Sequence, residues 1–166
     1  MVIPNALSLS GFEKSHALDE QIASHGRYVL FVGNISPKKN LARLCAAIEL
    51  ASKQEPTIKM LIAGDVKKIF VKQHLPATER TTLLGYLADD EKWAYVRNAH
   101  MLVLPSTNDE TFGLPLLEAM AAGVPTVSSD LATLSSVYGE ATLYADPFDE
   151  HAMAAAIEKV WSDLLP

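Results

Sequence analysis

The chain has 166 residues, 49% of them hydrophobic, and a formal net charge of -6. This length is enough for the core of one ordinary domain and too short for two comfortable ones. The negative charge argues against a nucleic acid as partner, because binding to a phosphate backbone needs a basic face. A single cysteine, Cys45, excludes an intrachain disulfide and indicates a reducing compartment. No apolar run reaches the roughly 18 to 20 residues that a bilayer requires, so we expect a soluble, cytoplasmic protein.

Residues 1–26 are polar and weakly periodic, which predicts an interdomain linker or arm with one short helix near 13–23. In the rest of the chain, 27–166, short apolar runs alternate with helical patterns, and this part is the predicted folded domain. Strands are predicted over 28–32, 58–63, 82–85, 101–104, 126–128 and 142–144. Helices are predicted over 37–53, 66–74, 89–98 with Asp89 as its cap, 115–122, 132–137 and 150–162.

This alternation predicts the fold class. Strands separated by helices imply right-handed crossovers and a parallel sheet covered on both faces. We therefore expect a doubly wound, Rossmann-like α/β domain with a parallel sheet of about six strands. In the commonest strand order of such sheets, the first strand lies beside the fourth, and ligands bind at their carboxyl ends.

The segment after the first predicted strand carries two lysines, Lys38 and Lys39. Ser36 is placed to cap the next helix and Pro37 to be its first residue, so both lysines fall in the first turn. Cations have the wrong sign for that end of a helix and cost roughly 0.3 to 1 kcal/mol each. The pair therefore indicates a bound anion, held by the lysines and by backbone N–H groups. A solvated surface pair is the alternative.

A second unusual segment follows the fourth strand and leads into an apolar helix. Gly113 and Pro115 favour a helix that starts at Pro115, and Gly123 is placed to end it. Within that helix Glu118 is the only polar side chain. Because burial of a carboxylate without a partner costs several kcal/mol, we expect Glu118 to face a cleft or a ligand.

Glu110 precedes this helix, so two carboxylates and the two lysines are expected at one crevice. A ligand that offers phosphates to the lysines and hydroxyls to the carboxylates is a nucleotide or a sugar phosphate. The alternative for Glu110 is a capping box with Thr107, which has the right spacing.

Other ligand signatures are missing from the sequence. No G-x-G-x-x-G follows the first strand and no G-x-x-x-x-G-K-[ST] occurs, which argues against a dinucleotide dehydrogenase and a P-loop NTPase. Asp65 lacks the companion acidic pair of a phospho-acceptor site and is interpreted as a turn residue. The five histidines show no ligand spacing and there is one cysteine, so we expect no structural zinc.

Several short motifs are similar to those of a known family, in the same order and at the same spacing. They are F-V-G-N at 31–34 with K-K-N at 38–40, G-Y-L at 85–87, P-S at 105–106, E-x7-E at 110–118 and A-D-P at 145–147. With them, the chain from 28 onward resembles the C-terminal, donor-binding domain of GT-B retaining glycosyltransferases of family 4 (glycosyl transferases group 1). The V-I-P-N run at 2–5 resembles the interdomain linker of that family, so the N-terminal acceptor domain is expected to be absent from this chain.

The resemblance implies roles for the matching residues. Lys39, with Lys38 or the turn of Gly33 and Asn34, would hold the donor diphosphate, and Glu118 would bind the ribose hydroxyls. Asn34 stands where many members carry arginine, which shifts diphosphate binding toward Lys38.

Further matching residues would contact the sugar and the base. Glu110 would contact the donor sugar, and with Lys39 it forms the implied catalytic pair. Tyr86 and Leu87 would lie against the base. The backbone that would contact the sugar and phosphates belongs to Thr111, which replaces a frequent glycine, and to Phe112, Gly113 and Leu114.

The implied function is transfer of a hexose, with retention, from a nucleoside diphosphate sugar to a glycan or lipid-linked acceptor in cell-surface polysaccharide synthesis. The donor would be GDP-mannose-like or a UDP-sugar, and no cofactor or metal is expected. The missing acceptor domain would provide a peripheral contact with the inner face of the membrane, and this chain alone would be inactive. Two alternatives stay open at this point: a non-catalytic nucleotide-sugar binding or regulatory module, and an unrelated doubly wound domain such as a signalling receiver.

Overall fold

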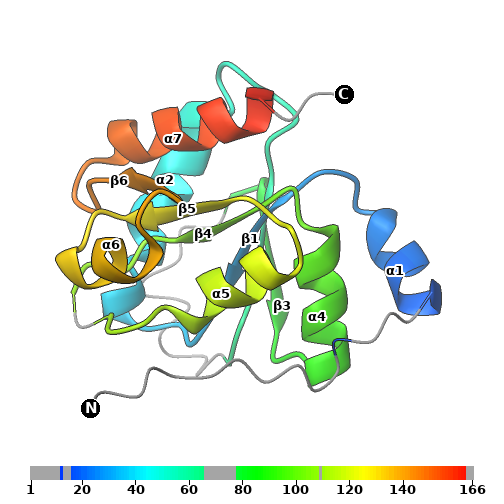
Figure 1. Ribbon diagram of the computed structural model, residues 1–166. Helices are drawn as coiled ribbons and strands as arrows, with labels where there is room; N and C mark the ends of the chain where they lie inside the picture. Colours follow the sequence, from blue (N-terminus) through cyan, green and yellow to red (C-terminus); the bar gives the residue numbers. More distant parts are fainter. Residues whose placement is uncertain (1–11, 13–15, 66–77, 109, 164–166) are drawn as a thin grey trace, which may run out of the picture.

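A computed structural model describes Phe12 and residues 16–65, 78–108 and 110–163. Six parallel strands form one sheet in the order β3-β2-β1-β4-β5-β6 (Figure 1). The first strand thus lies beside the fourth, and the predicted doubly wound fold is confirmed. The strands are β1 (Val29–Val32), β2 (Met60–Ala63), β3 (Thr81–Gly85), β4 (Met101–Leu104), β5 (Thr126–Ser129) and β6 (Leu143–Ala145). The helices are α1 (His16–Ala23), α2 (Leu41–Ala51), α4 (Asp89–Asn98), α5 (Leu114–Ala121), α6 (Ala132–Tyr138) and α7 (Glu150–Asp163).

Two hydrophobic clusters cover the two faces of the sheet. Val29 and Phe31 of β1 belong to the cluster under α2 and α7, and Leu30 belongs to the cluster under α1, α4, α5 and α6. Figure 1 shows these two groups of helices on opposite sides of the sheet. Because both faces are covered, β2, β4 and β5 are buried along their whole length and are continuous apolar or small-residue runs.

Helix α1 lies in the region that the sequence predicts to be an arm, and it packs against α4 of the folded domain. Arg97 of α4 is 3.0 Å from the carboxylate of Asp19, and the ring of Phe12 meets Trp93 edge-on at 4.9 Å. The predicted division of the chain near residue 26 stays a prediction. The helix predicted over 66–74 lies outside the described residues.

The connection between β1 and α2 differs from the prediction. The expected single helix over 37–53 is wrong: Pro37–Lys39 form a short 3-10 turn, and α2 begins only at Leu41. Between them Asn40 adopts a left-handed conformation, with φ 53°. Its buried amide donates a hydrogen bond of 2.6 Å to the carbonyl of Pro147. Asparagine tolerates this conformation better than most residues, so the long-range bond can break the helix here.

Two helix starts also differ from their expected positions. The expected cap of α4, Asp89, is wrong: Ala88 is the cap residue, and its N–H donates to the Glu91 carboxylate at 3.0 Å. Helix α5 begins at Leu114, one residue before Pro115.

The predicted end of α5 at Gly123 is confirmed. Gly123 has φ 73°, and its N–H donates to the carbonyl of Met120. The next N–H, of Val124, donates to Ala119. This hydrogen-bond pair is a Schellman motif.

The loops after β1, β2 and β3 lie against one another through backbone contacts of glycines. The N–H of Gly33 donates to the carbonyl of Ala63, and the N–H of Gly64 donates to the carbonyl of Gly85. A Cβ atom placed on Gly64 would lie 1.9 Å from the carbonyl oxygen of Gly33. Since that atom belongs to the backbone, no rotamer change can relieve the clash. A side chain at residue 64 would have to push the first two loops apart.

We expect Gly64→Ala to lower the free energy of unfolding by about 3 kcal/mol, because the methyl group overpacks a backbone contact. The matched control is Gly26→Ala, at φ 66° with no atom within 4 Å of the added Cβ. That control is expected to cost only the roughly 1 kcal/mol of a left-handed alanine. Denaturant unfolding of the three proteins measures the difference. Equal losses would refute the close approach of the loops.

Candidate functional site

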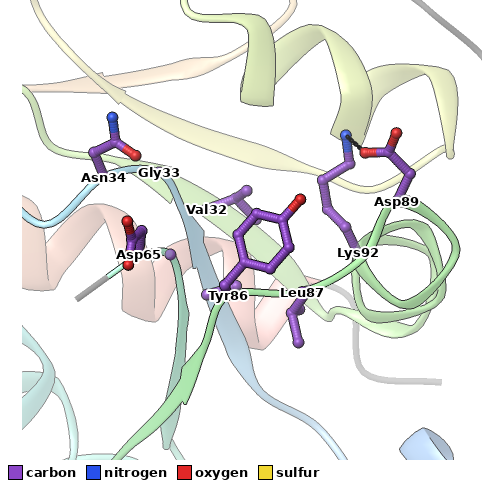
Figure 2. A pocket seen from close by; sticks show the side chains of 10 residues that line it. Val32, Gly33, Asn34, Asp65, Tyr86, Leu87, Asp89 and Lys92 are labelled. Carbon is purple, nitrogen blue, oxygen red and sulfur yellow. Dashed lines mark ion pairs between the residues drawn. The ribbon is translucent and has the colours of Figure 1, made fainter.

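An open cleft of about 350 Å³ lies at the carboxyl ends of β1, β2 and β3, beside the start of α4. The ring of Tyr86, 79% exposed, stands over it, with Asn34 and Asp65 on one side and Asp89 and Lys92 on the other (Figure 2). Ten residues line the cleft: Val32, Gly33, Asn34, Ala63, Gly64, Asp65, Tyr86, Leu87, Asp89 and Lys92.

The structure thus places four of the predicted site residues, Gly33, Asn34, Tyr86 and Leu87, around one cleft. It adds residues that the sequence analysis missed. Gly64 and Asp65 follow β2, so the rule that ligands bind at the carboxyl ends of parallel strands was a usable signal for them. Asp65 was interpreted as a turn residue, and here it is an exposed loop residue of the cleft wall.

Lys39 and Glu110 meet next to this cleft. The ammonium of Lys39 donates to Oε2 of Glu110, and the buried hydroxyl of Ser106 donates to the same oxygen at 3.0 Å. The side chains of Lys39 and Glu110 are 23% and 15% exposed. A Cβ on Gly33 would lie 3.9 Å from Cε of Lys39, so the lysine runs along the loop that lines the cleft.

The loop that carries the lysines is also held through its backbone. The N–H of Thr107 donates to the carbonyl of Lys38 at 3.0 Å, which joins the loops after β1 and β4. The alternative of a solvated surface pair is wrong for Lys39, because its side chain is mostly buried and is paired with Glu110. The helix-dipole argument for the two lysines is also wrong, because they precede α2 and do not lie in its first turn.

Glu118 has a partner within the chain. Its Oε1 atom lies 2.7 Å from Nζ of Lys92, and its side chain is 12% exposed. Lys92 lines the cleft and Glu118 does not, so the carboxylate reaches the cleft wall through the lysine. The pair joins residues 26 apart on two helices, and no sequence spacing pointed to it.

The segment before α5 is fixed by side chains of α6. The hydroxyl of Tyr138 shares its one proton between the carbonyls of Phe112 (2.7 Å) and Gly113 (3.1 Å), and the hydroxyl of Thr133 donates to the carbonyl of Glu110 (2.7 Å). A Cβ on Gly113 would lie 2.9 Å from Cδ2 of Leu104, so the leucine side chain would have to shift; the φ of 70° also favours glycine here. Thr111 and Leu114 are exposed.

The capping-box alternative for Glu110 is wrong. No helix starts in the described residues between Thr107 and Gly113, and the Glu110 carboxylate accepts bonds from Lys39 and Ser106.

Burial, then the charge of Glu110 and the neighbouring Tyr144, raise the pKa of Tyr138 from 10.0 to about 12.

We expect Tyr138→Phe to lower the free energy of unfolding by about 1 kcal/mol near neutral pH, because two carbonyls lose their donor. The folded-state pKa of this phenol lies above its unfolded value, so its contribution is complete below about pH 10 and is lost as pH rises through about 12. The stability gap between the two proteins should therefore shrink between about pH 8 and about pH 11.

Denaturant unfolding at both pH values measures this gap. Tyr86→Phe is the control, because the Tyr86 side chain is 79% exposed and is expected to leave stability unchanged. A gap for Tyr138→Phe that does not change with pH would contradict the assignment.

Within the described parts of the chain, no three His, Cys, Asp or Glu side chains form a group suited to a metal ion. The expectation that no metal is used stays a prediction. Among these same residues, no helix combines the length and the apolar character needed to cross a membrane.

Comparisons with known proteins match residues 14–164 to the family of glycosyl transferases group 1. The chain is 36% identical over 143 residues to O-antigen chain mannosyltransferase B of Escherichia coli, covering 82% of this chain and 37% of that protein. It is 32% identical over 165 residues to the phosphatidyl-myo-inositol mannosyltransferase of Mycolicibacterium smegmatis, covering 97% of this chain and 42% of that protein.

Solved structures show the same fold. Sucrose-phosphate synthase from Thermosynechococcus elongatus superposes with a TM-score of 0.79 at 27% identity, covering 97% of this chain and 43% of that one. Anabaena HepE, solved in complex with UDP and glucose, superposes with a TM-score of 0.83 at 22% identity, covering 98% and 47%.

The chain therefore belongs to the glycosyl transferases group 1 family. The resemblance inferred from its motifs is confirmed, and its α/β sheet is one half of a GT-B fold. The chain spans less than half the length of the relatives described here.

Proposed function

We propose that this chain is the donor-binding half of a retaining glycosyltransferase that moves a hexose from a nucleoside diphosphate sugar to a glycan or lipid-linked acceptor. One observation carries the proposal: the open cleft at the carboxyl ends of β1, β2 and β3 lies directly beside the ion pair of Lys39 and Glu110. The names of the mannosyltransferase relatives favour mannose as the sugar. The UDP bound in HepE supports a nucleoside diphosphate as the carrier.

In this proposal the ligand lies across the cleft. The base stacks on the exposed ring of Tyr86, next to Leu87, and the ribose points toward Lys92 of the cleft wall and the carboxylate of Glu118 behind it. The diphosphate lies over the loop of Gly33 and Asn34, within reach of the Lys38–Lys39 turn.

Lys39 supplies the charge stabilisation that the reaction needs. When the bond between the sugar and the diphosphate breaks, the leaving oxygen gains negative charge. The acceptor hydroxyl bonds to the sugar carbon, and its proton passes to the leaving diphosphate oxygen. An ammonium that already contacts the diphosphate before the bond breaks stabilises this charge more than water does, because it needs no further reorganisation during the step. Glu110 and Ser106 hold this region in place before the donor arrives.

Donor binding also frees Glu110 for the sugar. A diphosphate carries more negative charge than one carboxylate and competes for Lys39. Once Lys39 turns to the diphosphate, Oε2 of Glu110 can accept hydrogen bonds from sugar hydroxyls. The same carboxylate thus has a partner in both states, which avoids an unpaired buried charge.

We expect this chain to bind at least one of GDP, UDP and ADP in calorimetry, and Lys39→Met to weaken that binding about tenfold. Loss of one charge-assisted hydrogen bond, on the order of 1.5 kcal/mol, corresponds to this factor. Binding of the matching nucleoside, which lacks phosphates, should change less than about twofold, because Lys39 makes no contact with the base or ribose in this proposal.

The matched control is Lys159→Met, which removes an exposed lysine of α7 away from the cleft. It should bind like the parent. If the parent binds none of the three nucleotides or their sugar conjugates, the proposed function is wrong. If Lys39→Met weakens nucleoside and nucleotide equally, the assignment of Lys39 to the diphosphate is wrong.

In this proposal transfer needs a second domain besides the donor-binding one, as the greater length of the relatives suggests. The acceptor, and any contact with the inner face of the membrane, belong in this proposal to a second domain. We expect the isolated chain to transfer no labelled mannose or glucose to a glycan or lipid-linked acceptor, although it binds the donor. A radiochemical transfer assay measures this, and turnover by the chain alone would contradict it. Transfer after addition of an acceptor domain would exclude a purely regulatory binding module.

A further inference from the structure

Lys92 is the only lysine or arginine among the described residues that line the cleft. Its ammonium lies 2.7 Å from Oε1 of Glu118 on α5 and 3.6 Å from the Asp89 carboxylate one turn earlier on α4. It therefore sits between two carboxylates, at the point where α4 and α5 meet the cleft. Figure 2 shows Lys92 and Asp89 together on the side of the cleft opposite Asn34 and Asp65.

The position of Lys92 is fixed by the core. The next residue, Trp93, is fully buried, and its ring lies perpendicular to that of Phe12, with 4.9 Å between the ring centres. The Lys92 ammonium also lies 5.3 Å from the centre of the Trp93 ring, within the range of a cation–π contact. A lysine tied to such an anchor loses less freedom on pairing than a surface lysine does.

The burial of the pair separates it from an ordinary surface salt bridge. The side chains of Lys92 and Glu118 are 22% and 12% exposed, whereas that of Asp89 is 69% exposed. Removal of one partner from a mostly buried pair leaves the other charge without compensation, and this costs far more than the loss of an exposed pair. The Glu118 carboxylate therefore depends on Lys92 for its orientation.

We propose that Lys92 is a positioning residue for nucleotide recognition: it holds Oε1 of Glu118 so that Oε2 accepts hydrogen bonds from the ribose hydroxyls. This inference rests on the proposed function.

A simpler role for the pair is to join α4 to α5. In that case its loss lowers stability and weakens every ligand by the same factor. The positioning role instead predicts an effect that depends on the ribose hydroxyls. The two roles are therefore separated by a ligand that lacks those hydroxyls.

The experiment measures, by calorimetry, the binding of GDP, UDP and their 2′,3′-dideoxy forms to the parent chain, Lys92→Met, Lys92→Arg and Glu118→Gln. We expect Lys92→Met to weaken binding of the ribonucleotide about tenfold, the factor that corresponds to loss of one charged hydrogen bond. Binding of the dideoxy form should weaken less than about twofold. Lys92→Arg keeps the charge and should restore most of the preference for the ribonucleotide. The double variant Lys92→Met with Glu118→Gln should lose no more preference than either single variant, because the two residues act as one unit.

Lys159→Met is again the matched control, and circular dichroism with thermal unfolding checks that every variant is folded. Equal weakening of ribonucleotide and dideoxynucleotide in Lys92→Met would overturn the positioning role, and so would unchanged binding. Additive losses in the double variant would overturn the route through Glu118. Absence of any nucleotide binding by the parent chain would overturn the proposed function itself, and this inference with it.

Discussion

A carboxylate that folding removes from water needs a cation, and the site of this chain is arranged around two such pairs. Lys39 with Glu110 joins the loop after β1 to the loop after β4, and Lys92 with Glu118 joins α4 to α5. Both glutamates belong to the segment that enters and forms α5. That segment is thereby held to the two elements that border the cleft, and the charges meant for a ligand are already balanced when the cleft is empty.

Residues without side chains decide how closely the loops approach. Gly33 and Gly64 bring the ends of β1 and β2 within a distance that excludes a Cβ, and Gly113 allows the start of α5 to pack on Leu104. At these glycines the cleft wall carries no side chain, which leaves room for a bulky ligand. Tyr138 completes this arrangement by binding the carbonyls that precede α5. The shape of the site thus depends on packing, while its charge depends on the two ion pairs.

The alternation of apolar runs and helical patterns was enough to predict a doubly wound parallel sheet with the first strand beside the fourth, because parallel sheets restrict the ways in which such a chain can be wound. Each strand boundary fell within two residues of its predicted position. Local signals failed where a distant group decides the conformation. The bond from Asn40 to Pro147 breaks the predicted helix, and Lys92 supplies Glu118 with a partner from another helix. Neither contact can be predicted from the spacing of residue types in the sequence, because both join residues that only the fold brings together.

The bond between Asn40 and Pro147 also affects when, during synthesis of the chain, the turn beside the site can reach its final conformation. The two residues are 107 positions apart, so at ribosomal speeds of about 5 to 20 residues per second the partner of Asn40 is made roughly 5 to 20 s after Asn40 itself. Until then the turn with Lys38 and Lys39 lacks the contact that sets its conformation. The conformation of the turn that carries these lysines is therefore complete only when the segment between β6 and α7 has been made.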